Sequence, residues 1–271
     1  MPYAEIKGRR LFYEEHGDGF PVLFGHSYLW DAEMWRPQVE ELSRTYRCIV
    51  PELWGHGRSD ALPEIPYSIE ALAGDHMALI DALGIDRFAV VGLSVGGMWG
   101  THLALMDPGR VRALVLMDTF TGPEPPGARS RYFGMLDMVE QAGAIPAPLA
   151  DAILPLFFSP DTLEKRPELV SGFRESLLSI PPVRIPSIVA LGRAIFSRRS
   201  ILERSAAIGV PVLIAVGGDD RARPPDEARA MAEVMQNARL EVIPRAGHVC
   251  NLEQPGKVTA ILGDFLEDAL G

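Results

Sequence analysis

Four stretches of the chain consist almost wholly of apolar residues, and each is followed by a glycine or a polar residue. They cover residues 21–24, 88–91, 111–117 and 210–216. Runs of this kind are typical of strands that are buried on both faces, as in a parallel sheet. Two short alternating segments at 3–7 and 10–15, separated by Gly8, predict a hairpin ahead of the first of these strands.

The segments between the predicted strands repeat apolar residues at helical spacing. We predict helices at residues 34–44, 69–83, 98–106, 226–235 and 258–270, and two further strands at 47–50 and 239–243. Strands and helices in alternation imply right-handed crossovers and a sheet that is covered on both faces. The predicted fold class is therefore α/β, with a doubly wound, mostly parallel sheet.

The alternation stops between residues 121 and 205. Apolar residues there cluster with helical spacing and without a strand pattern, and prolines separate the clusters. The clusters lie at 135–139, 153–158, 173–180 and 188–196, and the prolines that cut them include Pro155, Pro160 and Pro181. We therefore predict a helical insertion at 121–205 between two parts of one α/β core, residues 1–120 and 206–271.

The bulk composition is that of an ordinary soluble globular protein, with 47% hydrophobic and 23% charged residues among 271. The formal net charge of −10 disfavours a nucleic-acid partner, because phosphate backbones would be repelled. Neither a secretory signal nor an apolar run of membrane-spanning length is visible, so a cytoplasmic protein without a membrane partner is expected. The oligomeric state stays open.

Cys48 and Cys250 lie far apart and show no CxxC or Cys/His ligand spacing. Two free, partly buried thiols are therefore expected, not a disulfide or a metal site. The six histidines are scattered and form no HExxH motif. We expect no metal and no other cofactor, and a small molecule as the partner.

Ser94 lies where a predicted strand turns directly into a predicted helix, in the sequence Gly92-Leu93-Ser94-Val95-Gly96. So tight a turn strains the serine backbone and needs small residues on both sides, which Gly92 and Gly96 provide. The Ser94 hydroxyl would stand above the end of its strand, and the Val95 amide would be available to an oxyanion. An ordinary glycine-rich turn is the alternative.

A serine hydroxyl needs an imidazole to accept its proton and a carboxylate to orient that imidazole. Asp220 and His248 follow Ser94 along the chain, each just beyond a predicted strand. Because the carboxyl ends of parallel strands share one edge of a sheet, these three side chains are predicted to meet. Competitors in similar positions are His26 and His56 for the base, and Asp219 and Asp118 for the acid.

Several motifs resemble those of the α/β-hydrolase superfamily, most closely the 3-oxoadipate enol-lactonases and small carboxylesterases. The shared segments are His26-Ser27, the GHGRSD turn at 55–60, the GxSxG motif around Ser94, and the histidine loop at 248–255. The family pattern GxxDxxxP falls on Gly217, Asp220 and Pro224, which favours Asp220 as the acid.

The resemblance implies further roles. The Tyr28 backbone amide would be the second oxyanion donor beside Val95, and Trp30 would be a wall of the substrate pocket. The insertion would be a cap over Ser94, the alternative being a helical decoration remote from the site. A lactone with a free carboxylate would need a cation. Arginines of the insertion, each expected in solvent, are Arg129, Arg131, Arg174, Arg184 and Arg193.

The predicted function is that of a serine hydrolase that cleaves a carboxylic ester or lactone through an acyl-enzyme, with Ser94 as nucleophile, His248 as base and Asp220 as orienting acid. Epoxide hydrolases and haloalkane dehalogenases resemble the chain but carry Asp in place of the serine in this turn, so Ser94 argues against both. One open alternative is a cofactor-free perhydrolase or haloperoxidase. A carbon–carbon bond hydrolase is another, although Leu93 stands where such enzymes tend to have Asn. The third is a non-catalytic ligand-binding protein of the same fold.

Overall fold

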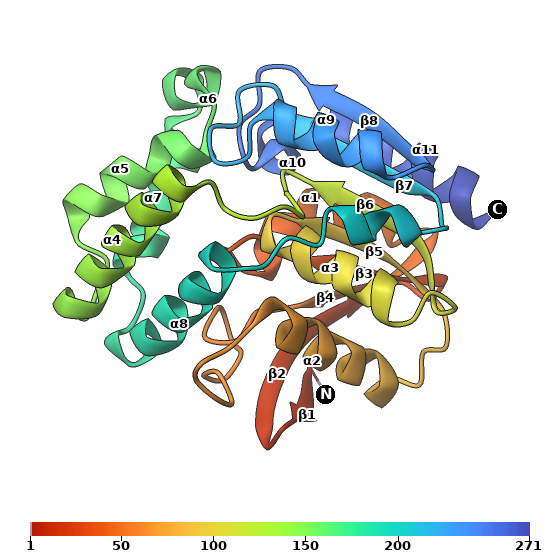
Figure 1. Ribbon diagram of the computed structural model, residues 1–271, viewed down its shortest axis with the longest axis horizontal. Helices are drawn as coiled ribbons and strands as arrows, with labels where there is room; N and C mark the ends of the chain where they lie inside the picture. The colour runs from red at the N-terminus through yellow and green to blue at the C-terminus, as the bar shows by residue number, and fades with distance from the viewer. Residues whose placement is uncertain (1) are drawn as a thin grey trace.

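The computed structural model describes residues 2–271, in which an eight-stranded sheet carries helices on both faces (Figure 1). The strand order is β1-β2-β4-β3-β5-β6-β7-β8. The strands are β1 (Tyr3–Ile6), β2 (Arg9–His16), β3 (Phe20–Gly25), β4 (Tyr46–Pro51), β5 (Phe88–Leu93), β6 (Val111–Met117), β7 (Val212–Gly217) and β8 (Ala238–Ile243). β2 pairs antiparallel with β1 and β4, and the other neighbours are parallel. The predicted α/β class and opening hairpin are confirmed.

Successive residues of the central strands point to opposite faces of the sheet and so build two cores. Val90 and Leu114 pack on one face, Val91 and Val115 on the other. The helices outside the insertion are α1 (Arg36–Leu42), α2 (Ile69–Ala82), α3 (Val95–Met106), α9 (Pro225–Val234), α10 (Cys250–Glu253) and α11 (Pro255–Leu270). α2, α3 and α9 cover the first face, and α1 and α11 cover the second. Burial on both faces explains why these strands are apolar throughout.

The insertion between β6 and β7 is helical throughout its regular elements and lies to the left of the sheet in Figure 1. Its α-helices are α4 (Pro126–Ala142), α5 (Ala147–Phe157), α6 (Pro160–Lys165), α7 (Pro167–Leu178) and α8 (Ile185–Phe196). The 3₁₀ helix η2 (Pro182–Arg184) lies inside the insertion, and η3 (Glu203–Ala207) lies at its end. Another 3₁₀ helix, η1 (Ala32–Trp35), lies outside the insertion, between β3 and α1. We keep the name helical insertion for residues 121–205.

Two predicted helix boundaries are wrong. Pro155 does not interrupt its apolar cluster but lies inside α5, which continues to Phe157. So near the end of a helix the missing N–H removes a single hydrogen bond, which the packing of α5 tolerates. The helix predicted to start at residue 34 is η1 followed by α1, which starts at Arg36 with Pro37 in its first turn.

No single helix within residues 2–271 combines the length and the apolar character needed to cross a membrane. By length and composition alone, α7 and the stretch Pro182–Phe196 would pass as a pair, but they meet at an angle of 78°. Ile188, Leu191 and Ile195 of that stretch are buried in the first core.

Candidate active site

Ser94 occupies the corner between β5 and α3 with φ 57° and ψ −119°, a conformation that residues with a side chain rarely adopt. Glycines make this corner possible. A Cβ on Gly92 would lie 2.3 Å from the Gly96 carbonyl carbon, and a Cβ on Gly96 would lie 2.2 Å from the Gly25 oxygen. The Ser94 amide donates to the Met117 carbonyl at 2.8 Å. The strained corner expected from the sequence is present, and it holds the hydroxyl at the end of β5.

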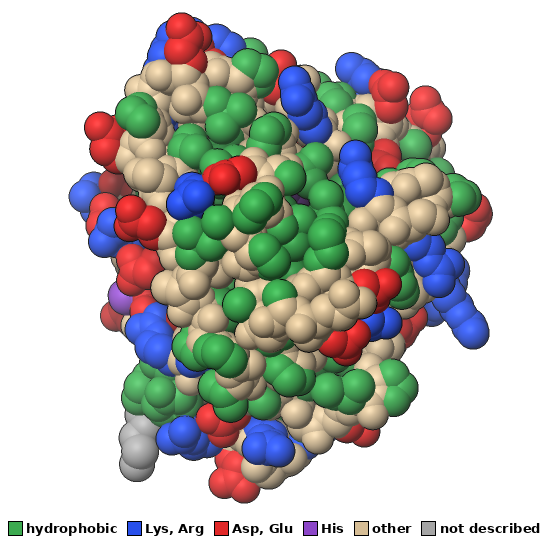
Figure 2. Space-filling model, turned by 90° about the vertical axis from the view of Figure 1, so that its left-hand side faces the viewer, with side chains coloured by type: hydrophobic (Ala, Val, Ile, Leu, Met, Phe, Trp, Pro, Cys, Tyr) green, Lys and Arg blue, Asp and Glu red, His purple; other side chains and the backbone are tan. Residues whose placement is uncertain are grey.

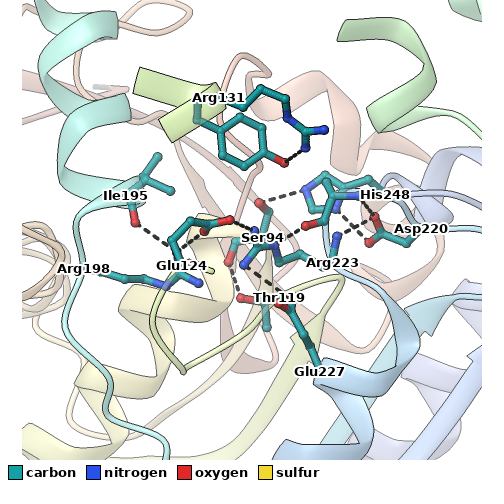
Figure 3. A network of polar contacts seen from close by, with 12 residues as sticks. Ser94, Thr119, Glu124, Arg131, Ile195, Arg198, Asp220, Arg223, Glu227 and His248 are labelled. Atoms are coloured by element: carbon teal, nitrogen blue, oxygen red, sulfur yellow. Dashed lines mark hydrogen bonds and ion pairs between the residues drawn. The ribbon is translucent and has the colours of Figure 1, made fainter. Parts of the chain in front are cut away.

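His248 lies between Ser94 and Asp220 (Figure 3). Its Nε2 is 2.9 Å from Ser94 Oγ, and its Nδ1 is 2.9 Å from Asp220 Oδ2. Because an ionised carboxylate can only accept, Nδ1 carries the proton and Nε2 presents its lone pair to the serine hydroxyl. The fold thus brings together three side chains that lie at the ends of β5, β7 and β8.

The loop after β7 holds the Asp220 carboxylate. Oδ1 accepts hydrogen bonds from the Ala222 amide at 2.8 Å and from the Arg223 amide at 2.9 Å. These two bonds leave Oδ2 to His248. The neighbouring Asp219 is exposed to solvent. The carboxylate that orients the imidazole is therefore the one that the motif pattern favours.

Asp118, the other competitor for the acid, is buried at the end of β6. Its Oδ1 accepts from the Gly217 amide at 2.7 Å and its Oδ2 from the Cys250 amide at 3.4 Å. Burial, and then the charge of Asp220, raises the pKa of Asp118 well above its ordinary value. These contacts join β7 to the histidine loop.

The competing histidines support the loop that carries Tyr28. His26 Nε2 accepts from the Leu53 amide at 2.9 Å, and His56 Nε2 accepts from the Leu29 amide at 3.2 Å. Burial lowers the pKa of His26 to about 4 and that of His56 to about 3. Both imidazoles are therefore neutral at physiological pH and act as acceptors for backbone amides.

The histidine loop is fastened to the helical insertion. The His248 amide donates to the Phe157 carbonyl at 2.9 Å. Glu253 accepts from the Gly247 amide at 2.6 Å and from the Ser159 amide at 2.9 Å. The Phe157 ring packs edge-on against the His248 imidazole, with 5.4 Å between centroids. The insertion therefore both covers the imidazole and fixes its backbone.

The two amides predicted as oxyanion donors come from different segments of the chain. Val95 is the first residue of α3, and Tyr28 lies in the loop after β3. The Tyr28 hydroxyl donates to the Ile188 carbonyl of α8 at 2.7 Å. Burial raises the pKa of the Tyr28 hydroxyl, so the side chain stays neutral and ties its loop to the insertion.

A cavity of about 100 Å³ lies over Ser94 and His248. Helices of the insertion supply most of its wall, with Met135, Leu136, Val139, Leu149, Ile153, Phe157, Ile188, Ile195 and Phe196. The charged side chains among its lining residues are Glu124 and Arg223. Figure 2 shows the face of the molecule that the insertion forms, where hydrophobic side chains gather around a hollow. The cavity is therefore mainly apolar.

The structure does not place Trp30 in this cavity. Its ring stacks on Phe173, with centroids 4.3 Å apart and planes 4° from parallel, and it lines a separate cavity of about 580 Å³. None of the five arginines considered for a substrate carboxylate lines the cavity over Ser94. Arg174 pairs with Asp151, and Arg193 pairs with Asp137 and Glu140, all of them near the surface.

Sequence reasoning missed the charged side chains beside this cavity. Glu124, Arg198 and Arg223 form a buried ion-pair network (Figure 3). No local pattern reveals it, because up to 99 positions separate the partners.

Cys48 and Cys250 are free and buried. Within residues 2–271, no group of three or more His, Cys, Asp or Glu side chains could hold a metal ion.

The sequence and the fold of this chain are similar to those of known proteins. The sequence model described as alpha/beta hydrolase fold matches residues 21–255. A relative from Azorhizobium caulinodans, provisionally named carbamate hydrolase RutD, is 30% identical over 98% of both chains.

Two solved structures are also similar. A thermophilic esterase from Thermogutta terrifontis shares 32% identity over 96% of this chain and 94% of its own, with a TM-score of 0.88. The enol-lactonase from Burkholderia xenovorans LB400 shares 29% identity over 98% of this chain and 100% of its own, also with a TM-score of 0.88.

Proposed function

The chain belongs to the α/β-hydrolase family, and on that premise we propose that it hydrolyses uncharged carboxylic esters or lactones through an acyl-enzyme on Ser94. The observation that carries the proposal is the pair of 2.9 Å contacts that His248 makes with Ser94 and Asp220 under an apolar cavity. A hydroxyl in contact with an oriented imidazole acceptor is what acyl transfer requires.

In the first step, Ser94 Oγ attacks the substrate carbonyl carbon while its proton moves to His248 Nε2. Asp220 stabilises the imidazolium through Nδ1–H. The tetrahedral intermediate collapses, and His248 gives the proton to the departing alkoxide, which leaves as an alcohol. In the second step, water attacks the acyl-enzyme with His248 again as base, which releases the carboxylic acid and restores Ser94.

The negative charge on the substrate oxygen needs donors that are already in place. We assign these to the backbone amides of Val95 and Tyr28. Val95 supports this assignment because an amide in the first turn of α3 has no acceptor within its helix. The partial positive charge at the N-terminus of α3 adds to the stabilisation of the oxyanion.

The cavity wall argues for a neutral, hydrophobic acyl group of modest size. A cavity of about 150 Å³ is known to accommodate benzene, so the smaller volume of about 100 Å³ suits a short aliphatic acyl group. Arg223 is a lining cation, but Glu124 and Glu227 already pair with it. A substrate carboxylate buried here would lack an unpaired cationic partner, which makes its burial unfavourable.

The test is the replacement Ser94→Ala, with a p-nitrophenyl butyrate assay and labelling by a fluorophosphonate. Removal of the nucleophile should lower kcat by about 10⁴-fold to 10⁶-fold and abolish labelling. Ser171→Ala, a change of an exposed serine on α7, is the control and should behave like the wild type. Activity that persists in Ser94→Ala would refute the proposal, and a wild type that neither reacts nor is labelled would indicate a non-catalytic binding protein.

A further inference from the structure

The Glu124 carboxylate joins three segments of the chain that lie far apart in sequence. Oε2 accepts from Arg198 Nη1 at 2.8 Å, and Oε1 accepts from Arg223 Nη2. Glu124 lies between β6 and α4, where the chain enters the helical insertion, and Arg198 follows α8, near its exit. Arg223 belongs to the loop of Asp220. The Glu124 side chain is only 1% exposed, so this junction is internal (Figure 3).

We propose that Glu124 is a positioning residue, which through Arg198 and Arg223 fixes the Asp220 carboxylate relative to the two ends of the helical insertion. The inference rests on the proposed function, because it concerns the orientation of the acid in that reaction. Glu124 does not itself transfer a proton or an acyl group.

The ion-pair network and the acid lie close together along the chain at Arg223. The Arg223 amide donates to Asp220 Oδ1 at 2.9 Å, and the Arg223 Nε–H donates back to the Ala222 carbonyl. The position of the Arg223 side chain therefore sets the turn that selects which oxygen of Asp220 faces His248. Glu124 holds the outer end of that side chain.

The positive and negative charges of the network balance each other. Arg223 Nη1 lies 3.5 Å from Glu227 Oε2, so two guanidinium groups face two carboxylates. Burial lowers the pKa of Arg198, whereas for Arg223 burial is outweighed by Glu227 and Glu124, which raise its pKa. Without the Glu124 charge, the buried guanidinium groups of Arg198 and Arg223 would repel each other, and only the Glu227 carboxylate would remain to balance their charge. They would move apart, and the Asp220 loop would move with Arg223.

A comparable ion-pair bridge in the helical insertion does not reach the acid. Arg193 of α8 pairs with Asp137 at 2.8 Å and Glu140 at 2.7 Å, and so links α8 to α4. Its side chain is 39% exposed, and its partners are more exposed still. Arg193 therefore serves as a matched control for an arginine bridge within the same insertion.

The test compares Glu124→Gln with Arg193→Met in the full-length protein. Glutamine keeps the size of the side chain and removes its charge. We expect kcat for p-nitrophenyl butyrate to fall between about 10-fold and 100-fold, as for a misplaced catalytic group, with KM changed by less than about twofold. The downfield proton resonance of the His248 Nδ1–H bond to Asp220 should shift or broaden. Arg193→Met should leave kcat, KM and this resonance at wild-type values.

A second variant keeps the inference falsifiable if Glu124→Gln folds poorly. Glu124→Gln/Arg198→Gln removes one anion and one cation, and leaves Arg223 paired with Glu227. The tie to the insertion is still lost, so kcat should again fall with KM nearly constant. Wild-type kcat and an unshifted resonance in both variants, with only the melting temperature lowered, would overturn the inference and make the network purely structural.

Failure of the inference is distinguishable from failure of the proposed function. If the wild type is active, Ser94→Ala is inactive and the Glu124 variants match the wild type, the inference alone is wrong. If the wild type does not react at Ser94, both are wrong.

Discussion

The ends of the central strands and the helical insertion contribute to the site in different ways. At the strand ends, Ser94, Asp220 and His248 are held by backbone hydrogen bonds and by one strained corner. In the insertion, apolar side chains from several helices enclose the space above Ser94. The difference indicates that the residues of the proposed reaction lie in short local motifs, whereas the cavity above them depends on packing between distant segments.

Two adjacent carboxylates in the loop after β7 allow the role of the strand ends to be tested. Asp220→Asn should lower kcat by about 10⁴-fold, because an amide stabilises the wrong imidazole tautomer. The exposed Asp219→Asn should keep the rate within about twofold. Steady-state kinetics on p-nitrophenyl butyrate measures both. A larger loss in Asp219→Asn than in Asp220→Asn would contradict the assignment.

The role of the helical insertion in substrate selection is tested with a series of p-nitrophenyl esters that differ in the length of the acyl group. Each added methylene should raise kcat/KM about fourfold until the cavity is filled, at about 0.8 kcal/mol per buried methylene. Ile153→Ala enlarges the cavity and should shift the preferred acyl chain by about two carbons. Val183→Ala, at a position 80% exposed, is the control. An unchanged preference in Ile153→Ala would remove the insertion from substrate selection.

Protonation of buried histidines in the core is expected to lower the stability of the protein in acid. Burial lowers the pKa of His26 and His76 to about 4 and that of His56 to about 3. In the unfolded chain the pKa is about 6.5, so the unfolded state binds more protons below that pH. The contribution of these neutral histidines to the free energy of unfolding is complete above pH 6.5 and is lost as pH falls toward 4. At pH 5 the loss is about 2 kcal/mol for each histidine.

Asp118, whose pKa is raised by burial, acts in the opposite sense, because its destabilising charge is removed as it protonates in the folded state. Urea unfolding at pH 7.5 and pH 5 measures the net change in the free energy of unfolding, which we expect to fall. His16→Gln, a change of an exposed histidine, should show the same pH dependence. A free energy of unfolding that is higher at pH 5 than at pH 7.5 would contradict the assignment of neutral buried histidines.

The sheet could be predicted from the sequence because each buried strand carries its own signal. The apolar run at 111–117 coincides with β6, and the glycines on either side of Ser94 predict the tight turn that the structure contains. The order of Asp220 and His248 along the chain and the shared edge of a parallel sheet left competitors for both roles, and the resemblance of their loops to family motifs then favoured the two residues that contact each other and Ser94.

The rest of the site depends on contacts that no local pattern records. Trp30 follows β3 as expected, but stacking on Phe173 turns it toward a different cavity. Glu124 and Arg223 pair across 99 positions, and only the folded chain brings them together. Side chains that enclose a space from several helices are therefore the part of the site that sequence reasoning reaches least well.

A covalent acyl-enzyme on Ser94 can be detected by mass spectrometry. The protein is mixed with p-nitrophenyl trimethylacetate, whose bulky acyl group slows deacylation, and is then quenched in acid. We expect a burst of p-nitrophenol equal to the enzyme concentration and one trimethylacetyl group on the peptide that contains Ser94, with neither in Ser94→Ala. Turnover without an adduct or burst, or an adduct on another residue, would contradict it.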